Sequence, residues 1–278
     1  MSLKTLEVTG HILDIASLVF RLRLLPTCKL AATCTMFWED GDIDMDMDMI
    51  RALFTCLISF LNKPVWRLVL HGHKAGDDYG ISLWTCTHPW AGKPLFPPDA
   101  DRMPCAKDAW QPNVQIIMHI AYYDALLNMA GPQSIPNHLQ WVCVNEGFIQ
   151  TVQVLDITDG VMTWLGYKWQ QLCENMVELQ HIRVNDRLRV DLAEVLIMLV
   201  PHLKTLTVMN ERFIPQLNEE GAFLKALART LKLRKGRISM LEGLHLQGYD
   251  ADLGKRMRHL VYMLRTERLV PVLIGESP

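Results

Sequence analysis

The stretch Asp191-Leu-Ala-Glu-Val-Leu-Ile-Met-Leu-Val-Pro-His-Leu-Lys-Thr-Leu-Thr-Val-Met-Asn210 predicts, in order, a helix, a stop, a strand and a turn. Its apolar residues from Leu192 to Val200 recur at helical spacing, and Pro201 ends the helix because proline lacks a backbone N–H. The next six residues, Leu203 to Val208, alternate in polarity and include β-branched residues, which is typical of a short strand. Since neither element can bury its apolar face alone, the unit must stack against others of its kind.

The same order of helix, stop and strand occurs on both sides of this unit. The strand pattern apolar-x-x-apolar-x-apolar reads Leu179-x-x-Ile182-x-Val184 before it and Leu241-x-x-Leu244-x-Leu246 after it. This pattern is typical of leucine-rich repeats, whose period is about 20–29 residues. Successive strands are 24 residues apart from Leu179 to Leu203 and 38 apart from Leu203 to Leu241, which predicts a loop inserted in the longer step. Weaker copies of the pattern begin at Leu3, Val65, Leu139, Val152 and Leu269.

These repeats predict an α/β leucine-rich-repeat solenoid, with a curved parallel sheet on the concave side and helices on the convex side. Residues 1–278 are expected to form a single such domain with irregular repeats. Leu139 and Val152 are too close for a helix between them, so one of these copies is expected at an edge or on the convex side.

The middle of the chain interrupts the repeats. The segment Ala75 to Pro112 is rich in proline and glycine, which exclude a long helix or a central strand. We expect a long surface loop over about residues 89–112. Its aromatic residues either pack under the loop or, in the case of Trp90 and Phe96, anchor a partner.

Composition narrows the class of protein. The net charge of −2 does not indicate a nucleic acid or an anionic membrane as partner. The seven cysteines form no C-x-x-C pair, as is usual for reduced cysteines inside cells. Without a signal peptide or an apolar run long enough to span a membrane, a cytoplasmic or nuclear location is expected. The C-terminal quarter is rich in lysine and arginine, which is consistent with a solvated basic helix face or a surface for an acidic partner.

The candidate chemical groups do not form a known constellation. His71, His73, Cys86 and His88 could bind zinc, but their spacing matches no familiar zinc site. The acidic stretch over residues 39–49 lacks the glycine and the final glutamate of a calcium loop, so it is expected to be a solvated loop before a helix. Phosphate-binding and hydrolase motifs are absent from the sequence, and Cys143 lies in an apolar strand pattern that predicts burial. No catalytic residue, metal or cofactor is predicted, and the chain is not expected to be an enzyme.

Several segments together suggest a family. They are Leu3-Lys-Thr-Leu-Glu-Val-Thr-Gly-His11, a helix with Leu18, Leu22 and Leu25, Pro26 to Cys34, Trp169 to Val184, Val200 to Val208 and Ala226 to Gly236. Over most of its length the chain resembles the leucine-rich-repeat region of F-box-like proteins from mushroom-forming fungi. The resemblance implies a substrate receptor of a cullin-type ubiquitin ligase, in which an F-box grips the adaptor and the repeats hold the target. This sequence contains no F-box pattern, so the chain is expected to be either a fragment of a longer protein or a repeat-only relative, and adaptor binding is not expected.

The predicted function is therefore to bind another protein on the concave strand face. The x positions of the strand pattern point away from the core and would contact the partner. These residues are Gln180, His181, Arg183, Lys204, Thr205, Thr207, Glu242 and His245. Two alternatives stay open: a metal-dependent hydrolase that uses His71, His73 and His88, and a ligand-sensing repeat fragment of an immune-type receptor.

Overall fold

A computed structural model of the chain divides into two compact units, Met1–Val152 and Gln153–Pro278. The structure describes residues 3–22, 28–37, 52–56, 64–72, 78–85, 113–121, 143, 147–159, 166–185, 193, 195, 200, 202–209, 222–234, 241–247, 262, 264, 265 and 269–275. The expected Pro-rich loop over residues 89–112, with Trp90 and Phe96, lies outside these residues, as does the acidic stretch over residues 39–49. The expectation of a single domain stays a prediction.

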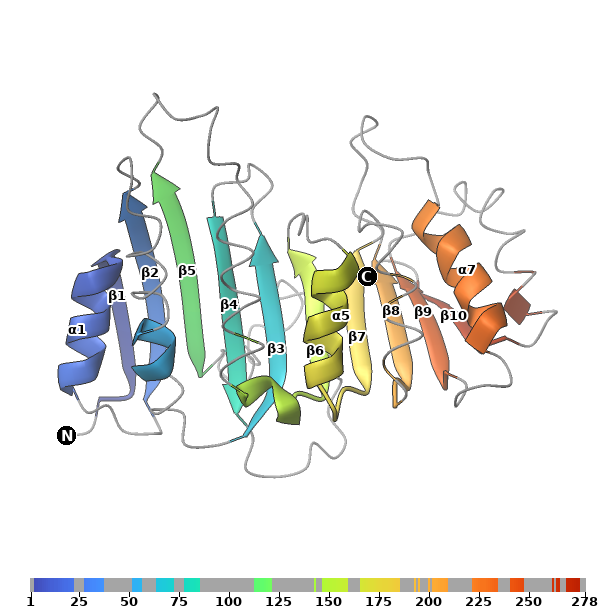
Figure 1. The fold of residues 1–278 in the computed structure, drawn as a ribbon, viewed down its shortest axis with the longest axis horizontal. Helices are drawn as coiled ribbons and strands as arrows, with labels where there is room; N and C mark the ends of the chain where they lie inside the picture. Colours follow the sequence, from blue (N-terminus) through green and yellow to red (C-terminus); the bar gives the residue numbers. More distant parts are fainter. Residues whose placement is uncertain are drawn as a thin grey trace. The chain divides into compact units, whose positions relative to one another are not determined.

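The first unit is a mixed sheet with a helix at one end (Figure 1). Its elements are β1 (Thr5–His11), α1 (Ile12–Leu22), β2 (Lys29–Phe37), β3 (Val65–Gly72), β4 (Asp78–Thr85), β5 (Val114–Ala121) and the 3-10 helix η2 (Phe148–Thr151). The strand order in this unit is β1-β2-β5-β4-β3. Strands β1, β2 and β5 are parallel, whereas β4 is antiparallel to both β5 and β3.

The antiparallel strand β4 corrects the expectation of a wholly parallel sheet. Only residues 73–77 separate β3 from β4. A parallel crossover needs about a dozen residues or more, so this connection permits only an antiparallel pair. The correction also places a strand within Ala75 to Pro112, where none was expected. Gly80 allows the close approach of β4 to β5, since a Cβ there would lie 2.3 Å from the carbonyl oxygen of Ile116.

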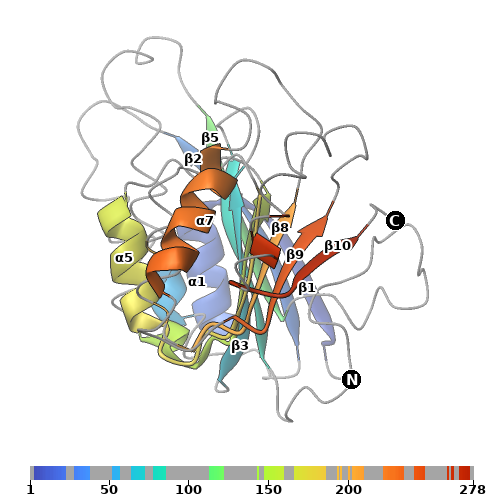
Figure 2. The same cartoon turned by 90° about the vertical axis from the view of Figure 1, so that its right-hand side faces the viewer.

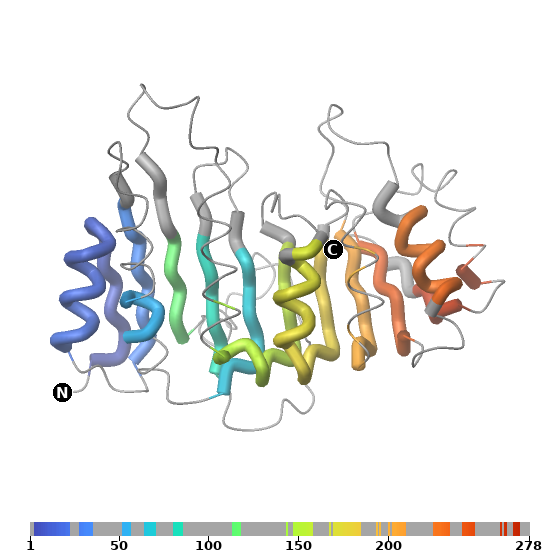
Figure 3. The backbone as a smooth tube through the Cα atoms, viewed as in Figure 1, coloured from blue at the N-terminus to red at the C-terminus, as the bar shows by residue number. Residues whose placement is uncertain are grey.

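The second unit is an open parallel sheet with helices on one face. Its elements are β6 (Val154–Asp159), α5 (Gly166–Asn175), β7 (His181–Asn185), β8 (Thr205–Met209), α7 (Ala222–Arg234), β9 (Gly243–Gln247) and β10 (Val272–Gly275). Each strand pairs in parallel with the next one in the sequence. Figure 3 shows these strands following one another along the chain, and Figure 2 shows α5 and α7 on the same side of them. The expected mixed α/β fold with a mostly parallel, open sheet is confirmed.

The repeated strand pattern forms the core of this second unit. Ile182, Leu206 and Leu244 occupy one register row across β7, β8 and β9, and each is 0% exposed. Trp169 of α5 and Leu227 of α7 are also fully buried. Burying a side chain of this size stabilises the fold by about 1.5–3 kcal/mol relative to leaving it exposed. A slip of the register by one residue would move this row to the opposite face, so its burial favours the observed register.

The strands begin two residues later than the pattern does. Leu179 and Leu203 are buried, but they precede β7 and β8. Each closes a turn, because the N–H of Leu179 donates to the carbonyl of Met176 (3.1 Å) and that of Leu203 donates to Val200 (3.2 Å). The first leucine of the pattern therefore enters the core from a turn, and only the last four positions are extended.

One further expectation needs correction. Cys143 has helical backbone and is 0% exposed, so its burial is confirmed but its place in a strand is wrong. His71 lies within β3. In the helix α1, Leu18 and Leu22 are 38% and 42% exposed, and Ile12, Ile15 and Val19 form its buried side.

Candidate partner-binding surface

Five of the eight predicted contact residues share one face of the second unit. His181, Thr205 and Gly243 form one register row across β7, β8 and β9, and Arg183, Thr207 and His245 form the next. Side chains alternate between the two faces of a strand, and the neighbouring apolar residues are buried on the helix side. The polar rows therefore lie on the opposite face, which we call the polar face.

The other three predicted residues, Gln180, Lys204 and Glu242, come just before these strands and join neighbouring units. The carbonyl of Gln180 accepts hydrogen bonds from the N–H groups of Lys204 (2.7 Å) and Thr205 (3.1 Å). The carbonyl of Lys204 likewise accepts from Glu242 (2.7 Å) and from the residue after it (3.3 Å). These residues therefore hold equivalent positions in successive units. Lys204 and Glu242 are exposed and Gln180 is half-buried, so all three border the polar face.

An ion pair within the polar face joins β6 to β7. The Nε of Arg183 donates to Oδ1 of Asp156 at 3.0 Å, and its Nη2 donates to Oδ2. Asp156 is 0% exposed and the Arg183 side chain is 14% exposed. A two-point contact of this kind fixes the plane of the guanidinium. Arg183 is thus held by the fold itself, which makes it a poor candidate for an adaptable contact residue.

The two histidines lie beside β8. Nδ1 of His181 and Oγ1 of Thr205 are 2.8 Å apart, which is a hydrogen bond between the first two strands of the row. Gly243 completes this row without a side chain, and a Cβ there would lie 3.1 Å from Nε2 of His245. The glycine therefore makes room for the imidazole of His245. Both histidines are half-buried, so part of each ring stays accessible.

Electrostatics keep these imidazoles neutral. Burial lowers the pKa of His181, and the positive charge of Lys204 lowers it further, while Glu242 acts in the opposite sense. Burial also lowers the pKa of His245. A neutral imidazole offers one donor and one acceptor, so near neutral pH these rings offer hydrogen bonds without charge. The polar face is therefore suited to a partner with hydrogen-bonding groups.

Sequence reasoning missed Asp156, the buried partner of Arg183. A signal was present, because Asp156 occupies in Val152-x-x-Leu155-x-Ile157 the same x position that Arg183 occupies in the next copy. Unit one has a comparable feature, in which the buried Arg67 places its guanidinium 4.6 Å from the ring centroid of Trp84. This cation–π contact stabilises the pairing of β3 with β4.

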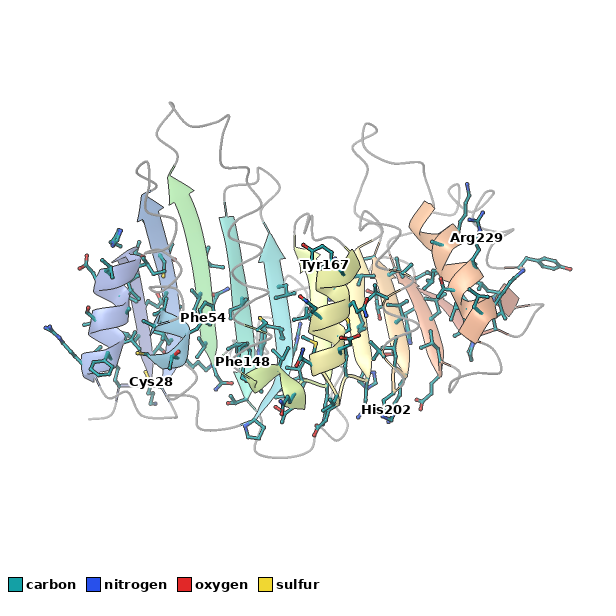
Figure 4. All side chains as sticks on the ribbon, in the orientation of Figure 1. Cys28, Phe54, Phe148, Tyr167, His202 and Arg229 are labelled. Atoms are coloured by element: carbon teal, nitrogen blue, oxygen red, sulfur yellow. The ribbon has the colours of Figure 1, made fainter. Side chains whose placement is uncertain are left out.

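The basic C-terminal region includes exposed side chains of α7. Lys225, Arg229 and Lys232 are all exposed, and their spacing places them on one side of the helix. Figure 4 shows Arg229 on α7. This arrangement is consistent with a solvated helix face, and an acidic partner for it stays a prediction.

The alternative metal site is only partly described. The backbone of His71 pairs with Gly80 in β3 and β4, while His73, Cys86 and His88 lie outside the described residues. Within the described part of the chain, no group of three or more His, Cys, Asp or Glu residues could hold a metal ion. None of the described helices is long and apolar enough to cross a membrane.

Comparison with known proteins adds no assignment: no protein-family model, curated protein or solved structure matches this chain.

Proposed function

We propose that the second unit is a leucine-rich-repeat solenoid that holds another protein on its polar face. The repeated use of equivalent carbonyls, Gln180 toward Lys204 and Lys204 toward Glu242, carries this proposal. Stacked repeats of this kind present a row of side chains from successive strands to a partner. In this role the chain would resemble the substrate-recognition repeats of an F-box ubiquitin-ligase receptor and would need no catalytic group.

The groups on the polar face support binding more than chemistry. His181 and His245 offer neutral hydrogen-bonding rings, and Lys204 and Glu242 place opposite charges at the border. Arg183 is already engaged with buried Asp156. Such a face favours a polar partner, and its specificity would come from the spacing of the hydrogen-bonding groups.

The test should leave the buried ion pair of Asp156 with Arg183 intact. We would replace Thr205→Arg together with His245→Ala, because both side chains are half-buried on the polar face. The matched control is Lys225→Ala with Arg229→Ala on α7, which also changes two side chains but on exposed helix positions. Quantitative co-purification from cells would identify partners, and their affinities for purified variants would then be measured.

The polar-face variant should lose at least about tenfold in affinity, or about 1.4 kcal/mol, because an arginine in the centre of the face obstructs close packing. The α7 control should bind as the unchanged protein does. Equal binding by all three proteins would exclude the polar face as the interface. Circular dichroism of each variant would check that the fold is intact.

A further inference from the structure

The outer edge of β1 in the first unit has a surface that is only half covered. Strand β1 pairs with β2 and with no other described strand. Leu6 and Val8 of β1 are half-buried, whereas Leu30 and Ala32, which pair with them on β2, are 1% and 2% exposed. The same row of side chains is therefore covered on β2 and open on β1, as expected where a neighbouring strand is missing.

On its outer side, β1 has no partner among the strands that the structure describes. The carbonyl of Lys4 accepts from the N–H of Lys29, so it faces β2 (2.8 Å). Since successive residues of a strand direct their backbone groups to opposite sides, Thr5, Glu7 and Thr9 direct theirs to the open edge. The strand has seven residues, contains neither proline nor lysine, and has Glu7 as its one acidic residue. Natural edge strands are often protected from pairing by proline or by charged side chains, and β1 has only Glu7 in this role.

The helix α1 adds an apolar surface at the same end of the sheet (Figure 1). Phe20 is 75% exposed, and Leu13 is 44% exposed. Leu18 and Leu22, on the other flank of the helix, are 38% and 42% exposed. Because both flanks of α1 carry exposed apolar side chains, the flank that faces the open edge of β1 is apolar in either case.

We propose that β1 pairs in antiparallel fashion with β1 of a second copy of this chain, which makes the protein a twofold-symmetric dimer. Any register whose twofold axis passes through a residue keeps the odd-numbered residues facing each other. Centring the axis on Glu7 places two carboxylates opposite each other, and centring it on Leu6 or Thr9 shortens the overlap. Centring it on Val8 pairs the whole strand and places Glu7 opposite Thr9 of the second copy, without facing like charges.

This symmetry also covers the exposed helix. The twofold axis of an antiparallel strand pair is perpendicular to the sheet, so both copies keep their helices on the same face. The two α1 helices would then lie side by side above the joined strands, and Val8 would meet Val8 of the second copy beneath them. The dimer thus buries the half-covered row and the apolar flank of α1 together, in an isologous interface.

Light scattering coupled to size-exclusion chromatography tests this proposal on the full chain. The expected mass is twice the 31.9 kDa of one chain and should fall toward 31.9 kDa on dilution. Thr9→Pro removes an N–H that faces the open edge and should give a monomer. Thr9→Val keeps the N–H and should remain a dimer.

A charge exchange tests the register itself. Thr9→Glu places a glutamate opposite Glu7 of the second copy, twice in each dimer, and should give a monomer. Adding Glu7→Lys to this variant should restore the dimer through two opposite-charge pairs. Circular dichroism would separate lost association from lost folding. A chain that is monomeric at every concentration, or a dimer that persists in Thr9→Pro and Thr9→Glu, would overturn the proposal.

Discussion

Replacing Arg183 by methionine tests how much the buried ion pair stabilises the second unit. Asp156 is 0% exposed, and Arg183 binds it through two hydrogen bonds while keeping 14% of its own surface exposed. Removing one member of a buried pair costs about 3–5 kcal/mol, because the other charge stays buried. Since the arginine is partly exposed, we expect the lower end, about 3 kcal/mol.

Urea unfolding measures this loss. With a slope of about 2 kcal/mol per molar urea, a loss of about 3 kcal/mol lowers the midpoint by about 1.5 M. Hydrogen exchange should rise in the peptides that cover β6 and β7, which localises the effect to the pair. The matched control is Arg229→Met on α7, an exposed position where the change in the free energy of unfolding should stay below about 0.5 kcal/mol.

The double variant Asp156→Leu with Arg183→Met separates two explanations. If the cost arises from an uncompensated buried carboxylate, removing both charges should recover most of the stability lost by Arg183→Met. If the cost arises from lost packing of the arginine stem, the double variant should be no more stable than the single one. An Arg183→Met protein as stable as the Arg229→Met control would refute the importance of the pair altogether.

Three other predictions concern Gly80, the two histidines of the polar face, and Cys143. Gly80→Ala should lower the melting temperature strongly, because the added Cβ would lie 2.3 Å from a backbone oxygen of β5. The control is Gly10→Ala, whose Cβ meets nothing within 4 Å and should leave the melting temperature nearly unchanged. Burial lowers the pKa of His181 and His245, so the unfolded chain takes up protons before the folded chain does as the pH falls below about 6.5. The melting temperature should therefore fall in this pH range. Replacing both histidines by asparagine should flatten this part of the curve of melting temperature against pH. Burial raises the pKa of Cys143 to about 12, so alkylation of this thiol should be slow in the native protein and fast in urea, as measured by mass spectrometry. Fast alkylation of the native protein would contradict the burial of Cys143.

The sequence predicts the second unit better than the first because its signals are local. Each described strand from Val154 onward coincides with one copy of the sequence pattern, and parallel strands in sequence order need no distant partner. Strand β4 is different, since its place depends on pairing with β5 across a long intervening segment. Its antiparallel direction follows from the short link after β3, and the proline content of the surrounding region hid the strand from a pattern search.

For the candidate surface too, the sequence pattern predicts the face of the sheet on which a residue lies but not the contacts of its side chain. Alternation within Leu-x-x-Leu-x-Val was sufficient to place Arg183, Thr207 and His245 on one face. It could not show that Arg183 is engaged with Asp156, because a single repeat holds only one member of that pair. An outward x position in a single repeat therefore indicates the face of the sheet and leaves the accessibility of the side chain undetermined.

Comparison between repeats supplies the missing information. In a parallel ladder, residues at the same pattern position of consecutive repeats are direct neighbours, so Asp156 must meet Arg183, and His181 must meet Thr205. Opposite charges at such positions predict an ion pair within the fold, and a glycine such as Gly243 predicts space for a side chain nearby. Contact residues for a partner are then expected among the positions whose ladder neighbours offer no opposite charge. On this criterion His245, whose neighbour is Thr207, is a stronger candidate than Arg183.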